Sequence, residues 1–284
     1  IVTPFRKGKV DERALADLIE WQIAHGTNGI VPCGTTGESA TLSHDEHNRV
    51  IELTVEVVRR RVPVVAGTGS NSTDEAIALT KHAKQAGADA ALLITPYYNK
   101  PTQEGLYRHY RAVAEAVDLP LVLYNIPGRT GVNMLPATIA RLTALPTIVG
   151  VKEGSGSVQQ ASDLVQMCGD RLTVLAGDDA LTLPMMAVGG KGVITVTANI
   201  VPAEMARLVA AFTEGKIEEA RRIHFKLSPL FAALFFETNP IPVKEALSLM
   251  GKIDPELRLP LCSMAQDTRE KLVQVLKDAS LITR

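Results

Sequence analysis

The sequence lacks a surplus of either charge. Its 30 Lys and Arg residues are balanced by 31 Asp and Glu residues, which leaves a formal net charge of -1. A protein that coats nucleic acid normally carries a basic excess or a basic stripe, so we expect no nucleic-acid partner. No stretch approaches the ~18 uninterrupted apolar residues that a membrane span requires, so we expect no membrane partner either.

Cysteine is also scarce. The three cysteines, Cys33, Cys168 and Cys262, are an odd number without metal-ligand spacing, which excludes a disulfide framework and a cysteine-based metal site. Free thiols are typical of a reducing compartment, so we expect a cytoplasmic location. The first residues show no charged lead before an apolar core and therefore predict no signal peptide. Because they open within a strand pattern and without Met, we expect a few residues to precede them.

One unit recurs along the chain: a short β-branched apolar run, a polar loop and a helical pattern. Strands this short and continuously apolar are buried on both faces, as in parallel sheets. The runs are residues 1–3 (a clipped first member), 29–32, 62–66, 90–94, 119–124, 148–152, 172–176 and 192–196. Eight strands alternating with helices predict an α/β fold, a closed (β/α)8 TIM barrel. An open doubly wound sheet is the alternative, but the first loop lacks its Gly-x-Gly-x-x-Gly turn.

Capping motifs mark where helices are predicted to begin after the apolar strand runs. Ser-x-x-Glu, the spacing of a capping box, occurs at residues 43–46 and again at residues 72–75. After residue 199 only helical patterns follow, at residues 202–214, 217–236, 243–250 and 265–279. The first of these completes the last barrel unit. Residues 1–214 are therefore predicted to form the barrel, and residues 215–284 a C-terminal helical appendage.

In a parallel barrel the active site lies at the carboxyl ends of the strands, and polar residues gather there in this sequence. Lys152 ends the apolar run 148–152. Burial disfavours the charged ammonium, and a neutral amine can attack a carbonyl to form a Schiff base. The alternative is a lysine that extends to a loop carboxylate such as Glu153. Position alone does not decide between the two.

Two further strand-end segments, residues 34–38 and 124–131, carry candidate chemistry. Tyr124 can shuttle protons near an amine; alternatively, it is a core tyrosine. Thr35 and Thr36, bracketed by glycines, offer hydroxyls and backbone amides to a small carboxylate; alternatively, they form a plain turn. Arg129 can hold a second carboxylate through its planar guanidinium; alternatively, it is a surface arginine.

Metal and histidine chemistry have little support in the sequence. Asp178 and Asp179 could bind Mg2+, but beyond Glu38 and Glu153 no third carboxylate follows a neighbouring strand, so a helix N-cap is preferred. No HxxxH, HExxH or cysteine cluster occurs, and no metal is predicted. The six histidines fall mostly in helical patterns, which argues against a His-based triad.

Six motifs occur along the chain in this order: Gly34-Thr35-Thr36-Gly37-Glu38-Ser39, Thr95-Pro96-Tyr97-Tyr98, Tyr124-Asn125-Ile126-Pro127-Gly128-Arg129-Thr130-Gly131, Lys152-Glu153, Gly177-Asp178-Asp179 and Asn239-Pro240-Ile241-Pro242-Val243-Lys244. Together they resemble the dihydrodipicolinate synthase family of pyruvate-dependent class I aldolases and lyases. The likeness covers essentially the whole chain. It implies a (β/α)8 barrel that condenses pyruvate with L-aspartate 4-semialdehyde, at the entry to the diaminopimelate branch of lysine synthesis.

The resemblance implies catalytic roles for four residues. Lys152 matches the Schiff-base lysine, and Tyr124 matches the general acid and base. Thr35 and Tyr98 match its proton-relay partners, with Tyr98 reaching in from a neighbouring subunit. No metal or organic cofactor is implied, because the lysine itself activates the substrate.

Substrate binding and assembly follow from the same resemblance. Thr36 and the backbone of Ile194 match positions that bind pyruvate. Arg129 matches the residue that receives the carboxylate of the semialdehyde. Members of the family are usually homotetramers built as dimers of dimers, so a homotetramer is expected here.

Some members of the family are inhibited by L-lysine at a subunit interface away from the barrel mouth. The matching positions carry residue types that this site uses: Ser39, Ala40, His44, His47, Asn71, Glu75 and Tyr97. Glu75 can pair with an ammonium, while Asn71 and the Tyr97 hydroxyl can bind a carboxylate. A capping box at residues 72–75 and exposed helix histidines are the alternative interpretations. We expect partial inhibition by L-lysine.

Two other functions stay open. A sister enzyme, N-acetylneuraminate lyase or a 2-keto-3-deoxy sugar-acid aldolase, would share Lys152 and Tyr124. Such enzymes typically lack an arginine equivalent to Arg129 and carry Ser-Thr in place of Thr35-Thr36. A catalytically inactive regulator that binds a small acid on the same fold is the alternative of another class, and the retained catalytic residue types argue against it.

Overall fold

The computed structural model describes residues 1–283 of the chain. By compactness the chain divides into two units, which we call the central unit (residues 63–195) and the terminal unit (residues 1–62 together with residues 196–283). Each unit buries apolar side chains of its own. Among the helices of the described residues, none is both long and apolar enough to cross a membrane.

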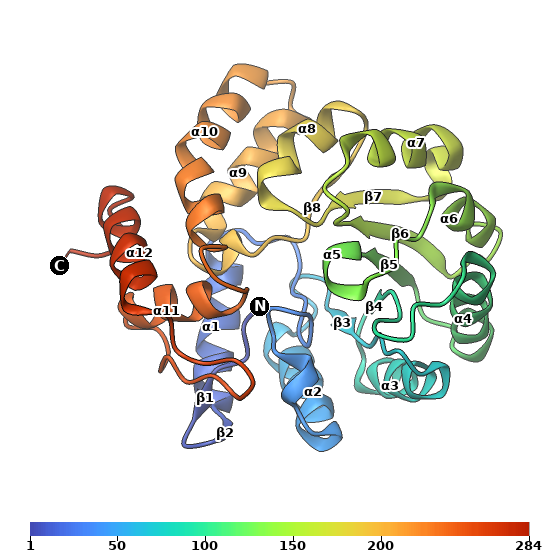
Figure 1. Cartoon of the computed structure of the whole chain (residues 1–284), viewed down its shortest axis with the longest axis horizontal. Helices are drawn as coiled ribbons and strands as arrows, with labels where there is room; N and C mark the ends of the chain where they lie inside the picture. Colours follow the sequence, from blue (N-terminus) through green and yellow to red (C-terminus); the bar gives the residue numbers. More distant parts are fainter. Residues whose placement is uncertain (284) are drawn as a thin grey trace. The chain divides into compact units, whose positions relative to one another are not determined.

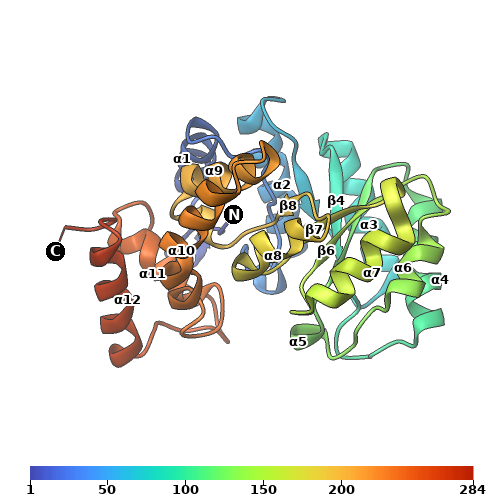
Figure 2. The same cartoon turned by 90° about the horizontal axis from the view of Figure 1, so that it is seen from above.

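The central unit is built from parallel strands alternating with helices. Its six strands are hydrogen-bonded in chain order and form one curled sheet (Figure 1). They are β3 (Val65–Gly67), β4 (Ala90–Ile94), β5 (Leu121–Asn125), β6 (Ile148–Glu153), β7 (Thr173–Ala176) and β8 (Gly192–Val193). The helices are α3 (Thr73–Ala86), α4 (Gln103–Ala116), α5 (Pro127–Thr130), α6 (Pro136–Leu142), α7 (Val158–Cys168) and α8 (Thr182–Ala187). Figure 2 shows α3, α4, α6 and α7 gathered on one side of the sheet, and consecutive members of this set contact each other.

The core of the central unit lies between the sheet and these helices. Leu93 of β4 and Leu123 of β5 belong to one buried cluster with Leu106 and Tyr110 of α4. All five residues of β5 are buried. A strand covered on both faces needs apolar side chains at successive positions, which explains why these strands are uninterrupted apolar runs in the sequence.

The terminal unit is mainly helical. A short antiparallel hairpin, β1 (Phe5–Arg6) with β2 (Lys9–Val10), precedes the helices. They are α1 (Glu12–Ala24), α2 (His44–Val58), α9 (Pro202–Thr213), α10 (Ile217–Ala233), α11 (Ile241–Leu249) and α12 (Gln266–Asp278), with short 3-10 turns at Ser39–Thr41 and Thr197–Asn199. Helix α12 packs against both α10 and α11, while α1 packs against α2. The four helices predicted after residue 199 are confirmed, with ends that shift by a few residues.

The first two predicted strands differ from expectation. Residues 1–3 and 29–32 form no regular strand in the structure; the Ile1 amino group donates to Val31 O at 3.0 Å, and only Ile30 has an isolated bridge. Pro4 and Pro32 close these runs, and a proline has no N–H to donate to a ladder. The predicted boundary between residues 214 and 215 stays a prediction.

The two Ser-x-x-Glu segments behave differently. At α2 the box forms, because Ser43 Oγ accepts from Glu46 N at 3.2 Å and Glu46 Oε2 accepts from Ser43 N at 3.0 Å. At α3 the predicted box is wrong. Ser70 Oγ accepts from Ser72 N at 3.0 Å and donates to the Glu75 carboxylate, so the box partner is already engaged.

Candidate active site

Tyr124 and Lys152 end neighbouring strands and are paired in register. They are partners in the β5–β6 ladder, as are the next residues, Asn125 and Glu153. Lys152 Nζ lies 4.3 Å from the centre of the Tyr124 ring, a cation–π distance. The lysine is half-buried, and the tyrosine is buried. An amine and a phenol are therefore held side by side at the carboxyl end of the sheet.

Glu153 is not a partner of Lys152. Successive residues of a strand point to opposite faces, which directs Glu153 away from the lysine. Its fully buried carboxylate accepts from Ser155 N at 2.7 Å, Gln160 Nε2 at 3.0 Å and Asn125 Nδ2 at 3.2 Å. Lys152 makes no ion pair with any residue that the structure describes, so the alternative of a lysine extending to Glu153 is not supported.

The amide of Asn125 connects the two strand ends to the following loop. Besides Glu153, its Nδ2 donates to Asn133 Oδ1 at 2.8 Å, and its Oδ1 accepts from Met134 N at 2.9 Å. Asn133 Nδ2 donates to Gln160 Oε1 of α7 at 2.9 Å. We call these side chains, Asn125, Asn133, Glu153 and Gln160, the amide network. The sequence motifs predicted no role for this network, although the polar residues directly after Tyr124 and Lys152 are a usable signal.

The other predicted residues of the central unit occupy loops at the same ends of strands. Arg129 is exposed and lies in the single-turn helix α5. Ile194 follows β8, and its N–H already donates to Ala176 O at 3.0 Å, which leaves its carbonyl for a ligand. Asp178 accepts from Ala180 N at 3.0 Å as the N-cap of a short 3-10 turn, in agreement with the preferred interpretation. No group of three metal-ligating side chains occurs within residues 1–283.

Tyr98 has an unusual backbone and an unusual environment. Its φ of 71° is left-handed, which is uncommon for a tyrosine, and its side chain is 90% exposed. Beside it, Asn71 Nδ2 donates to Tyr97 O at 3.2 Å, and Asn99 Nδ2 donates to Asn71 O at 2.9 Å. A ring so exposed makes little contact within its own chain.

The predicted L-lysine residues divide between the two units. In the central unit, Asn71 contacts Tyr97, and burial followed by the negative charge of Glu75 raises the pKa of Tyr97. These three residues therefore lie together. In the terminal unit, Ser39 and Ala40 form part of a 3-10 turn, and His44 and His47 lie in the first turns of α2. His44 is exposed, whereas His47 is buried.

Thr35 and Thr36 form a closed turn in the terminal unit. Gly37 N donates to Gly34 O at 3.1 Å, and Glu38 N donates to Thr35 O at 3.1 Å. Thr36 Oγ1 accepts from Asn239 Nδ2 at 3.0 Å, which leaves its own proton to donate. A hydroxyl with a free proton suits a carboxylate.

The chain is similar to known proteins over nearly its whole length. Residues 1–279 match the model of the dihydrodipicolinate synthetase family. The chain belongs to this family. It is 62% identical over 282 residues to the 4-hydroxy-tetrahydrodipicolinate synthase of Thermodesulfovibrio yellowstonii and 63% identical over 282 residues to that of Geotalea daltonii, with 99% of this chain and 97% of each relative covered.

Solved structures of dihydrodipicolinate synthases resemble the chain over nearly its whole length. The enzyme of Aquifex aeolicus is 48% identical with a TM-score of 0.98, covering 100% of this chain and 97% of that one. The chloride-inhibited enzyme of Acinetobacter baumannii, complexed with pyruvate, is 51% identical with a TM-score of 0.97. The enzyme of Cyanidioschyzon merolae, with lysine bound, is 41% identical with a TM-score of 0.96. Each of these two alignments covers 99% of this chain and 97% of the other.

Family membership settles the fold class and the type of protein. The predicted α/β fold, a (β/α)8 barrel with C-terminal helices, is confirmed. The prediction of an enzyme of the lyase class with synthase function is confirmed as well, and an inactive regulator is not supported. The roles of single residues stay predictions.

Proposed function

We propose that the chain condenses pyruvate with L-aspartate 4-semialdehyde through a Schiff base on Lys152 and forms 4-hydroxy-tetrahydrodipicolinate. The observation that carries this proposal is the Lys152 amine, 4.3 Å from the Tyr124 ring centre at the paired ends of β5 and β6. The names of the relatives support the product, and the pyruvate complex of the Acinetobacter baumannii enzyme supports the first substrate.

The chemistry follows from an amine beside a phenol. Lys152 Nζ attacks the ketone carbon of pyruvate, and Tyr124 moves protons while the carbinolamine loses water to give a protonated imine. The imine withdraws electrons, so a methyl proton leaves and an enamine forms. The enamine carbon attacks the aldehyde, and the amino group of the semialdehyde then adds to the imine carbon. Ring closure expels the lysine amine and regenerates the enzyme.

The remaining proposed roles follow the resemblance. Thr35 and Tyr98 relay protons to Tyr124, and the exposed Tyr98 ring acts in a neighbouring subunit of a homotetramer. Thr36 and the backbone of Ile194 bind pyruvate. The Thr36 hydroxyl accepts from Asn239 and keeps its proton to donate, which supports a role of Thr36 in binding pyruvate. Arg129 receives the second carboxylate.

Assembly, organisation and location complete the proposal. Residues 1–214 form the barrel and residues 215–284 the helical region, although residue 284 lies outside the described residues. The chain acts as a homotetramer in the cytoplasm. The mass in solution tests the assembly, and a monomer with full activity would contradict the role of Tyr98 across subunits. Removal of the Tyr98 hydroxyl in Tyr98→Phe should slow turnover without changing that mass.

Borohydride trapping tests the covalent step. With pyruvate and borohydride the wild-type chain should gain one pyruvate-derived adduct, and peptide mapping should place it on Lys152. Lys152→Ala should lose the adduct and most activity, because no other group supplies the amine. Lys191→Ala removes an exposed lysine before β8 and serves as the control. An adduct on a different lysine, or full activity in Lys152→Arg, would contradict the mechanism.

Arg129→Ala tests the second substrate. Loss of a charge-assisted contact to a carboxylate should cost roughly 2–4 kcal/mol of transition-state binding for the semialdehyde. Formation of the pyruvate adduct should stay nearly unchanged. Efficient cleavage of sialic acid by the wild type, without condensation of the semialdehyde, would instead assign the chain to the sister lyases.

L-Lysine is proposed as a partial inhibitor that binds through Ser39, Ala40, His44, His47, Asn71, Glu75 and Tyr97. The lysine-bound enzyme of Cyanidioschyzon merolae and the grouping of Asn71, Glu75 and Tyr97 support this proposal. A lysine titration of steady-state rates should show partial inhibition, which Glu75→Ala weakens and the exposed-face control Glu115→Ala does not. The proposal would be refuted if millimolar lysine did not inhibit the wild type, or if it inhibited Glu75→Ala as strongly as the wild type.

A further inference from the structure

Glu38 ends the Thr35–Thr36 turn in a conformation that few residues adopt. Its backbone is left-handed, with φ 54° and ψ 37°, a region that non-glycine residues seldom occupy. Its side chain is only 1% exposed. Because Glu38 N donates to Thr35 O, any shift of residue 38 also moves the turn. A strained backbone persists only where surrounding contacts hold it.

Lys244 of α11 supplies such contacts. Its Nζ donates to Glu38 Oε1 at 2.6 Å and to Thr3 O at 3.0 Å, and its side chain is fully buried. Thr3 Oγ1 in turn donates to Gly37 O at 2.7 Å. The lysine therefore reaches the turn by two paths, through the carboxylate of residue 38 and through the backbone of residue 37.

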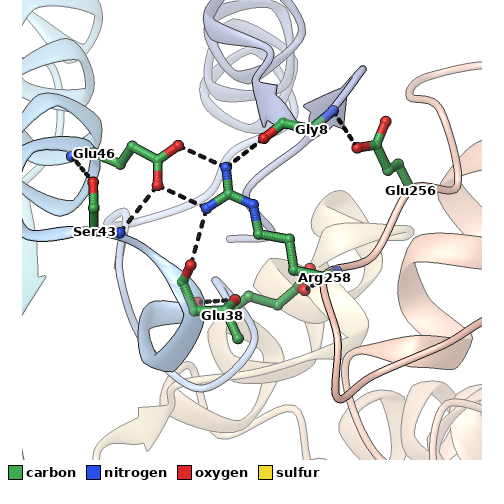
Figure 3. Close-up of polar contacts among 7 residues, drawn as sticks. Gly8, Glu38, Ser43, Glu46, Glu256 and Arg258 are labelled. Atoms are coloured by element: carbon green, nitrogen blue, oxygen red, sulfur yellow. Dashed lines mark hydrogen bonds and ion pairs between the residues drawn. The ribbon is translucent and has the colours of Figure 1, made fainter.

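Arg258 holds the other side of the carboxylate. Its backbone N–H donates to Glu38 Oε2 at 3.3 Å. Figure 3 shows its guanidinium directed the other way, where Nη1 donates to Glu46 Oε2 at 2.7 Å and Nη2 donates to Gly8 O at 2.8 Å. The centre of the buried Phe5 ring lies 4.2 Å from the guanidinium carbon of Arg258 and 4.2 Å from Nζ of Lys244. The α2 capping box, the β1–β2 hairpin and the turn are thus joined through one arginine.

A buried ion pair of this kind is weak evidence for stability. Removing two charges from water costs free energy that their attraction offsets only when the geometry is good, and neutral replacements are often as stable. Burial lowers the pKa of Lys244, and the charge of Glu38 opposes that shift. Stability alone therefore does not explain the buried charges. The hydrogen bonds by which Lys244 and Glu38 hold the turn do explain them.

We propose that Glu38 is a positioning residue for the reaction, and that its ion pair with Lys244 orients the hydroxyls of Thr35 and Thr36 toward pyruvate. The inference rests on the proposed function. Asn239 donates to Thr36 Oγ1 from the segment that leads into α11, so the C-terminal region contacts the turn at Thr36 as well as at Glu38. The C-terminal helices then complete the pyruvate site in addition to covering apolar surface.

Steady-state kinetics of Glu38→Gln and of the double variant Glu38→Gln/Lys244→Met test the inference. In both, pyruvate KM should rise about 10- to 100-fold, because small misplacements of binding groups cost that much, while kcat falls less. The double variant removes both charges and should unfold near the wild-type temperature. Glu204→Gln removes the half-buried partner of the exposed Lys226 and should leave both constants unchanged.

The outcomes separate a positioning role from a structural one. A double variant that unfolds near the wild-type temperature and keeps the wild-type pyruvate KM would show that the pair does not position the turn, and would overturn the inference. Should Glu38→Gln fail to fold, Glu38→Asp keeps the charge and retracts it by one methylene, and an unchanged KM there also overturns the inference. Absence of a trapped adduct on the wild type would refute the proposed function itself. A normal wild-type adduct with unaltered variants would refute only the positioning role.

Discussion

Glu38 in the terminal unit and Glu153 in the central unit are both buried carboxylates beside proposed reactive residues, yet their environments differ. Glu38 contacts the ammonium of Lys244 at 2.6 Å. Glu153 accepts only from neutral groups, the amides of Asn125 and Gln160 and a backbone N–H. No Lys, Arg or His forms an ion pair with Glu153 in the part of the chain that the structure describes.

The difference shows two ways to satisfy a buried carboxylate. The side chains of Asn125 and Gln160 present only hydrogen-bond donors to the Glu153 carboxylate. Their oxygens already accept from other groups, Asn125 Oδ1 from Met134 N and Gln160 Oε1 from Asn133 Nδ2. Several moderate hydrogen bonds to the Glu153 carboxylate join it to groups 2, 7 and 28 residues away. The ion pair of Glu38 instead joins segments 206 residues apart by a single short contact. Loss of one partner should therefore be more damaging at Glu38 than at Glu153.

The largest expected effect is that of Lys244→Met. The substitution leaves the Glu38 carboxylate buried without its cation, which should lower the free energy of unfolding by about 3–5 kcal/mol. Urea unfolding measures this change, with Lys226→Met as the control at an exposed ion pair. Adding Glu38→Gln should recover much of the loss. Equal unfolding free energies for Lys244→Met and its control would show that Glu38 does not depend on its cation, and would contradict the proposed difference between Glu38 and Glu153.

Glu153→Gln should have a smaller effect. One amide hydrogen-bond donor of the new side chain must face another donor, and an unsatisfied buried group costs about 1–3 kcal/mol. Because the amide network holds the ends of β5 and β6, trapping of pyruvate on Lys152 should also slow. Glu104→Gln changes an exposed carboxylate of α4 and is the control. A variant with wild-type stability would mean that the network does not require a carboxylate.

The two Ser-x-x-Glu segments extend the comparison to helix caps. Ser43→Ala removes the side-chain cap of α2 and should destabilise the chain by about 1 kcal/mol. Ser72→Ala should change the free energy of unfolding by no more than about 0.3 kcal/mol, because Ser72 caps α3 without a side-chain hydrogen bond. Thermal and urea unfolding of both variants, compared with the wild type, measure these changes in the free energy of unfolding. Equal losses would show that Ser72 caps its helix in solution.

The smallest expected effect concerns Glu46 and acid. The hydrogen bond from Arg258, with a further one from Ser43, lowers the pKa of Glu46 from 4.5 to about 2. A lowered pKa in the folded state stabilises the fold above pH 4.5, and that contribution disappears as the pH falls toward 2. The difference in unfolding free energy between wild type and Glu46→Gln should be constant from pH 7 to 5 and shrink below pH 4.5. A difference that stays constant down to pH 3 would contradict this assignment.

Prediction from the sequence succeeded where the signal is local. The β5 and β6 runs predicted buried parallel strands, so Tyr124 and Lys152 were expected at strand ends, and the ladder pairs them. The cap at Ser43 was also predicted. The cap at Ser72 failed because Ser70, two residues earlier, binds the Ser72 N–H and the Glu75 carboxylate, which would form one of the two hydrogen bonds of the box. That competition depends on the turn before α3, which the Ser-x-x-Glu pattern does not encode.

By itself the sequence determined the order of strands and helices from residue 63 onward, the residue types at the strand ends and the family resemblance. These depend on periodicity, on caps and on motifs within a few residues. Only the tertiary structure decided which carboxylate meets a cation. Glu38 and Glu153 each follow a strand-end motif, but one is paired with Lys244 and the other with amides. Hydrogen bonds and ion pairs act over about 3 Å, so the partner of a buried charge is defined only once distant segments have folded together.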